Sequence, residues 1–330
     1  MSGLTPKVDI VVDLQFGSTG KGLLCGYLAD TREYDTVISA NMPNAGHTYI
    51  NADGEKWMFK VLPSSAIGKS VKTVMLGPGA IFSLTRLVEE MSHLRSDQRL
   101  VIHPNAVLLS EDHAKKERKK LQHISSTTQG SAAAMIEKIW RSGKAPTAGS
   151  ILKGTKFDSL VASHDEWQIR LSMADAILAE GSQGFSLGIN SQFYPYTTSR
   201  DCTPAAFLSA MSVPLAMLNE VYGVARTLPI RVGGPSGDCY PDQIELTWEQ
   251  VGQPLERTTV TNKIRRIFSY SQKQMEDAIF NCNPDHIFLN FCNYVTEEEV
   301  QQMVAHIDQY SNVRWVGFGP TFNDVGVLHG

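Results

Sequence analysis

A glycine-rich segment near the start of the chain has the composition of a phosphate-binding loop. The segment Gly17-Ser18-Thr19-Gly20-Lys21-Gly22 follows an apolar run that ends at Leu14. Glycine lets the backbone turn tightly and approach a phosphate, and the N-terminus of a following helix presents free N–H groups to an anion. A standard P-loop would have Gly at position 15 and Ser or Thr at position 22, so Gln15 and Gly22 exclude a Walker A motif. Taken alone, the segment fits either a phosphate site, to which Lys21 adds a positive charge, or a glycine-rich turn without a ligand.

Three further loops carry polar residues that could act on phosphates or carboxylates. Residues 41–48 contain His47, a residue type that can donate a hydrogen bond to a phosphate or act as an acid. Residues 180–184 come before a second polar stretch, residues 194–200. Residues 258–266 combine hydroxyls with cations, which suits recognition of a carboxylate or a phosphate. Each of these loops could by itself be an ordinary surface loop, and it is their combination and order that indicates a functional site.

The periodicity along the chain predicts an α/β fold that would position these loops. Short apolar runs rich in β-branched residues alternate with segments of helical period, which is typical of strands buried on both faces of a mostly parallel sheet. The predicted strands are residues 8–14, 36–40, 73–76, 100–103, 176–180, 221–226, 286–290 and 313–318. The predicted helices are residues 22–30, 83–96, 111–123, 132–142, 204–219, 270–280 and 296–310. We expect a single large domain, residues 1–330, with helices on both faces of a central sheet and ligands beyond the carboxyl ends of its strands.

Composition and charge exclude several other classes of protein. The 330 residues are 42% hydrophobic and 19% charged, which is typical of a globular protein and not of a disordered one. A net charge of -4 gives no general attraction for nucleic acid or for an anionic membrane. The N-terminal residues lack the apolar core of a signal peptide, no apolar run is long enough to cross a bilayer, and the five cysteines form no C-x-x-C pair. We therefore expect a cytoplasmic protein, in the cytoplasm of a host cell if it is viral, with neither nucleic acid nor membrane as a partner.

The motifs, taken in order, resemble the signature of the adenylosuccinate synthetase family. That signature is a W-G-D-E-G-K-G loop, N-A-G-H-T, T-T before a helix, E-G-A-Q-G with Y-P-Y-x-T-S, R-V-G-G and a T-T-G-R-x-R-R loop. The matching segments here are residues 16–22, 44–48, 127–128, 180–184 with 194–199, 231–234 and 259–266. Because they follow the family's order from the first predicted strand to the last, the resemblance covers almost the whole chain.

The resemblance implies an adenylosuccinate synthetase-like fold, related to that of P-loop NTPases, and a ligase reaction in two steps. In the first step N1 of a 6-oxopurine nucleotide loses its proton and O6 attacks the γ-phosphate of a nucleoside triphosphate. In the second step the amine of aspartate displaces phosphate at C6. Cations and hydrogen-bond donors stabilise the charge that develops on the transferred phosphoryl group. The family also implies Mg²⁺ as a cofactor and a homodimer, in which Arg141 would reach the purine monophosphate of the neighbouring subunit.

The resemblance also assigns roles by position. The catalytic residues would be Ser18, His47 and Lys21, with Ser18 and the carbonyl of Gly46 as ligands of Mg²⁺. The triphosphate would be held by Gly17, Thr19, Gly20, Lys21, Gly22, Gly46, His47, Thr48, Asn290, Gly317, Gly319 and Pro320. The purine monophosphate would be held by Ser18, Asn44, Thr127, Thr128, Arg141, Gln183, Leu187, Thr198 and Val232, and aspartate by Thr259, Thr261, Lys263 and Arg265.

Departures from the family pattern bear on the substrates. Ser18 stands where the family has its catalytic Asp, and a neutral hydroxyl is a far weaker base than a carboxylate. The smaller, uncharged side chain would leave room for a 2-amino group, which distinguishes guanine from hypoxanthine. The family reads the guanine of GTP with T-K-L-D, whereas residues 289–293 read L-N-F-C-N, and the loss of the Asp favours ATP or dATP. The chain is also shorter than a usual member, and Lys263 replaces an Arg.

These departures match one branch of the family, the phage-type enzymes that join aspartate to dGMP with ATP or dATP and supply 2-aminoadenine for DNA. On this interpretation the products are N6-succinyl-2-amino-2′-deoxyadenylate, ADP and phosphate, and Ser18, a water or the γ-phosphate relays the N1 proton. An ordinary member that uses IMP and GTP is the first alternative, and a non-catalytic nucleotide-binding paralogue is the second. The sequence leaves open the choice between dGMP and GMP and between ATP and dATP.

Overall fold

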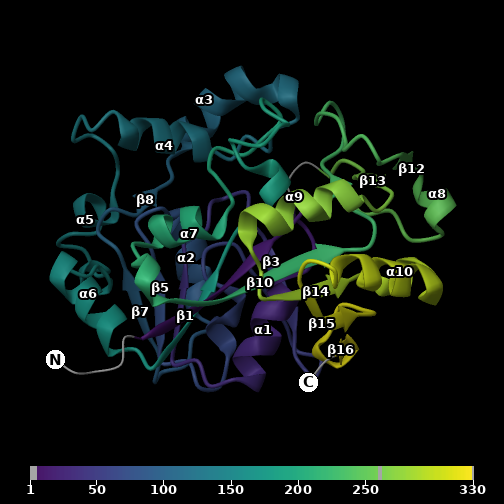
Figure 1. Ribbon diagram of the computed structural model, residues 1–330. Helices are drawn as coiled ribbons and strands as arrows, with labels where there is room; N and C mark the ends of the chain where they lie inside the picture. The colour runs from purple at the N-terminus through teal and green to yellow at the C-terminus, as the bar shows by residue number, and fades with distance from the viewer. Residues whose placement is uncertain (1–5, 259–261, 329–330) are drawn as a thin grey trace.

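The computed structural model describes residues 6–258 and 262–328, which are built around one nine-stranded sheet (Figure 1). The strand order is β16-β15-β14-β10-β1-β9-β2-β5-β7, and neighbouring strands run parallel except for β15 and β16. The strands are β1 (Lys7–Asp13), β2 (Thr36–Ser39), β5 (Thr73–Leu76), β7 (Arg99–Ile102), β9 (Ala176–Glu180), β10 (Leu218–Arg226), β14 (His286–Asn290), β15 (Asn312–Gly317) and β16 (Val325–Val327). All the strands predicted from the sequence lie in this sheet, so the predicted α/β class is confirmed.

Helices surround the sheet, and within the described residues three small sheets lie outside it. The helices are α1 (Lys21–Thr31), α2 (Leu84–Met91), α3 (Glu111–Leu121), α4 (Ser131–Ile139), α5 (Ala148–Ile151), α6 (His164–Met173), α7 (Pro204–Met211), α8 (Trp248–Val251), α9 (Gln272–Cys282) and α10 (Glu297–Ile307). The small sheets pair β3 (His47–Ile50) with β4 (Lys56–Phe59), β6 (Ile81–Phe82) with β8 (Val107–Leu108), and β13 (Arg266–Phe268) with both β11 (Ile230–Arg231) and β12 (Glu245–Leu246).

The two faces of the sheet are buried against different helices. Side chains alternate along a strand, and in β1 Val8, Ile10 and Val12 point into one core while Val11 points into the other. The first core is completed by apolar residues of α6, α7, α9 and α10, and the second by residues of α1, α2 and α5. Helices therefore cover both faces of the sheet, as the strands' continuous apolar composition predicts.

Several predicted boundaries are wrong, and some elements were not foreseen. The predicted helix 204–219 ends at Met211, because Ser212 takes a left-handed conformation with φ 55° and the chain then enters β10 at Leu218. The predicted helix 83–96 likewise ends at Met91. His47 was expected in a loop, but it is the first residue of β3 in a β-hairpin that no sequence motif marked.

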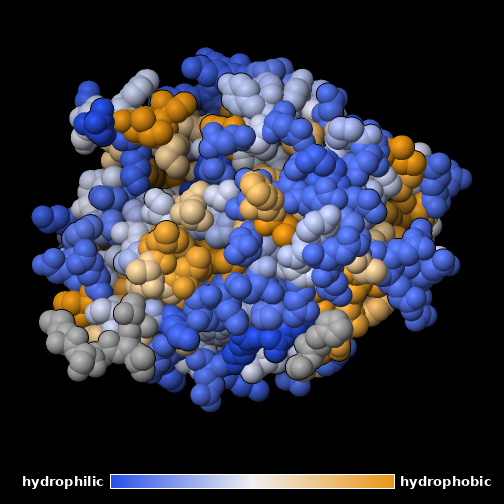
Figure 2. All heavy atoms as spheres, in the orientation of Figure 1, coloured by the Kyte–Doolittle hydropathy of each residue, from blue (hydrophilic) through white to orange (hydrophobic). Residues whose placement is uncertain are grey.

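The viewed face of the molecule is mostly hydrophilic, with apolar side chains gathered over α4 and α7 (Figure 2). Near α4 the large apolar side chains that are exposed belong to Ile136, Ile139 and Trp140. No helix in the described part of the chain is both long enough and apolar enough to span a membrane.

Candidate active site

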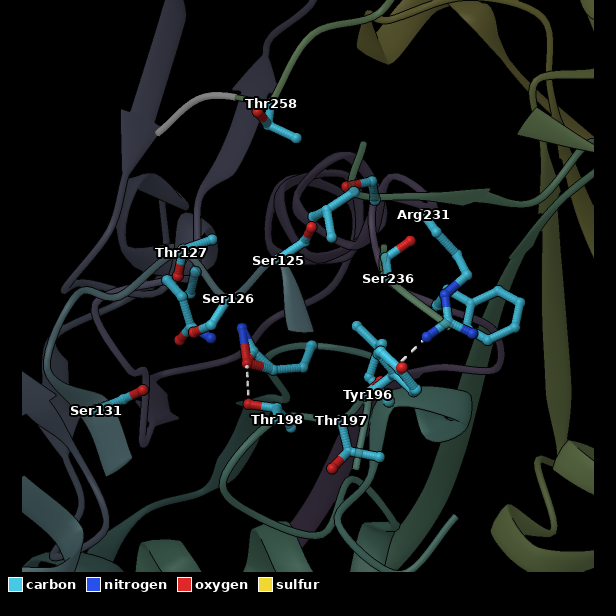
Figure 3. A pocket seen from close by; sticks show the side chains of 18 of the residues that line it. Ser125, Ser126, Thr127, Ser131, Tyr196, Thr197, Thr198, Arg231, Ser236 and Thr258 are labelled. Carbon is cyan, nitrogen blue, oxygen red and sulfur yellow. Dashed lines mark hydrogen bonds between the residues drawn. The ribbon is translucent and has the colours of Figure 1, made fainter. Parts of the chain in front are cut away.

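A pocket of about 820 Å³ lies beyond the carboxyl ends of β1 and β9. Its walls come from segments far apart in sequence: the loop after β1, the start of β3, the segment before α4, the loop after β9 and the segment after β11. In Figure 3 the hydroxyls of Ser125, Ser126, Thr127, Thr197 and Thr198 surround this pocket, with Arg231 on one side. The tertiary structure thus brings the four polar loops of the sequence to one place.

Most of the residues predicted for the site line this pocket. They are Gly17, Ser18, Thr19, Gly20, Lys21, Gly22, Asn44, Gly46, His47, Thr48, Thr127, Gln183, Leu187, Thr198, Val232 and Arg265. The residues that do not line it are Thr128, Arg141, Lys263, Asn290, Gly317, Gly319 and Pro320. The predicted aspartate ligands Thr259 and Thr261 lie outside the described residues.

The loop after β1 wraps closely around its neighbours. Gly17, Ser18 and Gly20 have positive φ values of 87°, 58° and 97°. A Cβ atom on Gly20 would lie 2.1 Å from the amide nitrogen of Asn290, so only glycine fits there. That amide donates to the carbonyl of Thr19 at 3.0 Å, and Asn290 is buried. Asn290 therefore supports the loop from behind and does not face the pocket.

Asp13, the last residue of β1, organises this loop, although no role was predicted for it. Its Oδ1 accepts the backbone N–H groups of Gln15 and Gly17 at 2.9 and 3.1 Å. Its Oδ2 accepts the Thr19 hydroxyl at 2.5 Å and the Lys21 ammonium at 3.0 Å. The signal in the sequence was a carboxylate at the end of the apolar run Ile10–Val12, just before the glycine-rich segment.

Lys21 is held in place on both sides. Besides Asp13, its Nζ donates to the carbonyl of Gln183 at 2.8 Å, and the side chain is 5% exposed. The lysine therefore joins the loop after β1 to the loop after β9. In this arrangement its positive charge lies at the pocket wall with one carboxylate as counter-ion.

His47 is paired with a buried carboxylate at the other side of the phosphate loop. Its Nδ1 contacts Oε1 of Glu180, whose Oε2 accepts the N–H and the hydroxyl of Ser64 at 2.8 and 2.9 Å. Burial opposes ionisation of Glu180, but His47 and Ser64 outweigh it and hold the pKa of Glu180 below its usual range. A carboxylate on Nδ1 leaves Nε2 as the ring nitrogen that a ligand in the pocket can reach. Glu180 belongs to a matched motif, yet its role was not predicted.

Amide and hydroxyl groups suited to a purine nucleotide also line the pocket. Gln183 has a positive φ of 67°, and its Oε1 accepts the Thr198 hydroxyl at 3.1 Å (Figure 3). Leu187 contributes an apolar surface, and its carbonyl accepts the N–H of Thr198 at 2.8 Å. The Oδ1 of Asn44 is buried, and no group in the described part of the chain hydrogen-bonds to it, so it is an acceptor that a ligand's N–H or O–H group would satisfy.

Two arginines bring positive charge to the pocket. The Arg231 guanidinium donates to the carbonyls of Asp238 and Tyr196 and stacks on Phe16 and Phe193, with ring centroids at 4.4 and 5.0 Å. Burial, with a contribution from the charge of Arg266, lowers the pKa of Arg231 to about 10. Burial also lowers the pKa of Arg265. Because desolvation disfavours both charges, an anionic ligand would stabilise them.

Phe291, just after β14, supplies an aromatic surface beside the phosphate loop. It has a positive φ of 60°, and the Arg226 guanidinium lies 3.8 Å from its ring centroid. Arg226 is fully buried, donates to the carbonyl of Ser18 at 3.3 Å and pairs with Glu256 at 2.7 Å. The ring therefore has a cation on one face while it also lines the pocket.

Comparison with known proteins supports the resemblance seen in the sequence. The model of the family described as adenylosuccinate synthetase matches residues 10–168 and 153–292. This chain belongs to the adenylosuccinate synthetase family. One relative, the N6-succino-2-amino-2'-deoxyadenylate synthase of Vibrio phage phiVC8, is 53% identical over 337 residues, which cover 97% of each chain.

Solved structures of the family have the same fold. The succinoaminodeoxyadenylate synthetase of cyanophage S-2L, bound to dGMP and to dATP as an energy donor, superimposes with a TM-score of 0.93 at 34% identity. The match covers 99% of this chain and 97% of the cyanophage chain. Adenylosuccinate synthetase from Plasmodium falciparum superimposes with a TM-score of 0.82 at 18% identity and covers 98% of this chain and all of its own, which supports the fold alone.

Proposed function

We propose that this family member joins L-aspartate to C6 of dGMP at the expense of ATP or dATP. The products are N6-succinyl-2-amino-2′-deoxyadenylate, ADP or dADP, and phosphate, and the product serves the synthesis of 2-aminoadenine DNA. The observation that carries the choice of guanine is Ser18, an exposed, uncharged side chain on the pocket side of the phosphate loop. A relative that is 53% identical over 97% of the chain and carries the name of such a synthase supports the same choice.

In the first step, O6 of the purine attacks the γ-phosphorus and the bond to the β-phosphate oxygen breaks, so that ADP or dADP leaves. The donors around that phosphoryl group would be Lys21, at the loop, and Nε2 of His47, whose ring is fixed by Glu180. Donors that are already in position stabilise the developing charge without further reorganisation. We place the relay of the N1 proton on Ser18: its hydroxyl takes the proton from N1 and gives its own proton to a water or to an oxygen of the γ-phosphate.

In the second step, the amine of aspartate attacks C6, and the C6–O6 bond breaks with phosphate as the leaving group. Aspartate brings two carboxylates, and Arg265 lines the pocket with a guanidinium that is largely withdrawn from water. A guanidinium can hold a carboxylate through two parallel hydrogen bonds. We assign the aspartate site to this side of the pocket, together with Lys263.

The residues present fit Mg²⁺ bound mainly through phosphates. The described residues contain no cluster of three or more His, Cys, Asp or Glu side chains that could hold a metal ion. The pocket instead offers the hydroxyl of Ser18 and the carbonyl of Gly46. The space beside Gly46 is open, since a Cβ atom added to this residue would meet no atom within 4 Å. Mg²⁺ prefers oxygen ligands and usually combines few protein ligands with substrate phosphates and water. When bound, it would neutralise charge on the triphosphate.

We also propose that the enzyme is a homodimer and works in the cytoplasm of an infected host cell. Arg141 follows α4 and lies on the surface, next to the exposed side chains of Ile139 and Trp140. A group of exposed apolar side chains indicates a protein interface more often than a single exposed apolar side chain does. A partner bound there would place Arg141 near the neighbouring pocket, and the phage origin of a close relative supports the location.

A substrate panel tests the proposed function. Purified protein is incubated with aspartate and each pair drawn from dGMP, GMP, IMP and dIMP with ATP, dATP and GTP. Phosphate release and the mass of the succinyl product are measured. We expect aspartate-dependent release with dGMP and an adenine nucleotide. Release only with IMP and GTP would instead support an ordinary adenylosuccinate synthetase, and nucleotide binding without any release would support a non-catalytic paralogue.

A further inference from the structure

A second, smaller pocket lies on the far side of α4 from the active site. Its volume is about 280 Å³, and its lining includes Lys138, Arg200, Asp201 and Ser209. On α4, Ala132 and Ile136 line the large pocket, while Met135 and Lys138 line the small one. Two adjacent residues before α7 also face different pockets: Ser199 lines the large pocket and Arg200 lines the small one. The two pockets therefore share a wall.

Two cations line the small pocket without a carboxylate partner. The ammonium of Lys138 donates to the carbonyls of Pro78 and Asn105, and the guanidinium of Arg200 donates to those of Ala40 and Gly79. Within residues 6–258 and 262–328, no carboxylate forms an ion pair with either side chain. Arg200 is 8% exposed, so its charge is largely withdrawn from water.

Among the described residues that line the pocket, the carboxylate of Asp201 forms no ion pair with these cations. Asp201 lines it, but its oxygens accept the N–H of Cys202 and the side-chain amide of Asn190 at 2.6 and 3.0 Å. Burial and the nearby charge of Arg200 lower the pKa of Lys138, and burial lowers the pKa of Arg200 to about 10. Two positive charges that are close together and partly withdrawn from water are unfavourable unless an anion binds to both.

Donors remain for such an anion. An ammonium has three N–H groups and a guanidinium five. Backbone carbonyls accept two hydrogen bonds from Lys138 and two from Arg200, so each side chain has N–H groups left for a ligand. The exposed residue Ser209 adds a hydroxyl at the rim. Oxyanions that carry two charges and several acceptor oxygens match paired cations best.

We propose that the pocket between α4 and α7 is a second anion site that binds a phosphate group through Lys138 and Arg200. The phosphate is either free inorganic phosphate or the phosphate of a small nucleotide, because both present the same oxygens. A bound anion would link Lys138 of α4 to Arg200. It would thereby hold in place their neighbours Ile136 and Ser199, which line the active site. This inference does not depend on which purine the large pocket accepts.

The test is equilibrium dialysis of radiolabelled inorganic phosphate against the full-length protein, with the active site filled by dGMP and a non-hydrolysable ATP analogue. Wild-type protein should bind one further phosphate per chain. Lys138→Gln should weaken this binding about tenfold, on the scale of one charge-assisted contact. Lys144→Gln is the matched control, because this exposed lysine follows the same helix without lining the pocket, and its binding should be unchanged.

A second variant covers the case in which Lys138→Gln disturbs the fold. Ser209→Glu places a carboxylate at the rim of the pocket, leaves both cations in place and should abolish the extra phosphate. Absence of the extra phosphate in wild type, or equal binding in wild type and both variants, would overturn the proposal. Competition with dAMP identifies the source of the phosphate: displacement indicates a nucleotide phosphate, and none indicates the free ion.

Discussion

At the scale of single residues, buried carboxylates fix the polar groups that act in the pocket. Asp13 holds the phosphate loop and Lys21, and Glu180 holds the ring of His47. A buried carboxylate is costly unless it is paired and hydrogen-bonded, and both are. Each carboxylate therefore stabilises the fold only while its cationic or polar partner stays in its functional place.

The first prediction concerns His47. In His47→Ala we expect kcat to fall about 100- to 1000-fold, the usual effect of removing one donor to a transition state. The KM values should change less, because the contact matters most while phosphoryl transfer is under way. Steady-state assays of phosphate release measure both, and His93→Ala, which removes an exposed histidine, is the control. Turnover close to wild type would remove His47 from the mechanism.

The second prediction concerns the pH dependence of stability. The folded-state pKa of Glu180 is depressed, so its ionised form stabilises the fold above the ordinary glutamate pKa, about 4.3, and this contribution is lost as pH falls. We expect the difference in unfolding free energy between wild type and Glu180→Gln to shrink as the pH is lowered from about 6 to about 3. Denaturant titrations at each pH measure it. A constant difference would mean that the charge of Glu180 does not stabilise the fold.

The third prediction concerns the choice of purine at Ser18. Ser18→Asp should lower kcat/KM for dGMP by about tenfold or more, because a larger, charged side chain crowds the 2-amino group. Ser18→Ala keeps the space, so it should bind dGMP normally and lose only what the hydroxyl adds to proton transfer and to Mg²⁺ binding. Kinetics with dGMP and with dIMP, which lacks the 2-amino group, separate the two effects. Unchanged use of dGMP by Ser18→Asp would refute the steric explanation.

At the scale of elements, the ends of neighbouring strands set what surrounds the triphosphate. β10 lies between β1 and β14, so Arg226 at its end reaches both the Ser18 carbonyl and the Phe291 ring. Phe291 stands in the segment where the resemblance places the family's guanine-reading T-K-L-D motif, whose Asp is absent here. An aromatic ring backed by a cation can stack on any purine and selects the base less strictly than a carboxylate does.

The fourth prediction follows from that arrangement. Phe291→Leu should raise the KM for dATP about tenfold, since stacking of a base on an aromatic ring contributes about 1–3 kcal/mol. The KM for dGMP should stay near wild type, and Phe291→Trp should retain tight binding of dATP. Phe280→Leu is the control, because Phe280 is an exposed aromatic residue on α9 that does not line the pocket. An unchanged KM for dATP would place the base elsewhere.

At the scale of the whole molecule, the site is expected to need two copies of the chain. The described pocket takes residues from both halves of the sequence, yet Arg141 lies away from it on the surface beside α4. The exposed side chains of Ile136, Ile139 and Trp140 in the same region are 47%, 60% and 73% accessible. Contact with a second copy would bury them and could bring Arg141 to the neighbouring nucleotide.

The fifth prediction is complementation between two inactive variants. His47→Ala and Arg141→Ala should each have low activity as homodimers. If Arg141 acts in the partner's site, a mixed dimer has one site with both residues intact, so mixing and subunit exchange should restore part of the activity. Phosphate release before and after mixing measures this, with Trp140→Ser expected to weaken the dimer in sedimentation experiments. No recovery on mixing, despite confirmed exchange, would mean that Arg141 does not act in trans.

The sequence by itself determined the class of fold and the identity of the site. Continuous apolar runs predicted the strands of the large sheet, because strands buried on both faces leave no room for polar alternation. The order of the motifs identified the family, and Ser18 pointed to guanine because the substitution changes charge and size at one position. Local patterns were enough for these conclusions, since each depends on residue type and order.

Only the tertiary structure decided which groups touch. Asp13 reaches Lys21 because a helix begins just after the loop, and Glu180 meets His47 because β9 lies beside β2, whose continuation carries His47 into a hairpin. α7 ends at Met211 because Ser212 takes a left-handed conformation, and the spacing of apolar residues in the sequence does not reveal this conformation. The small pocket with Lys138 and Arg200 joins residues with no shared motif, so it could be found only after the chain had folded.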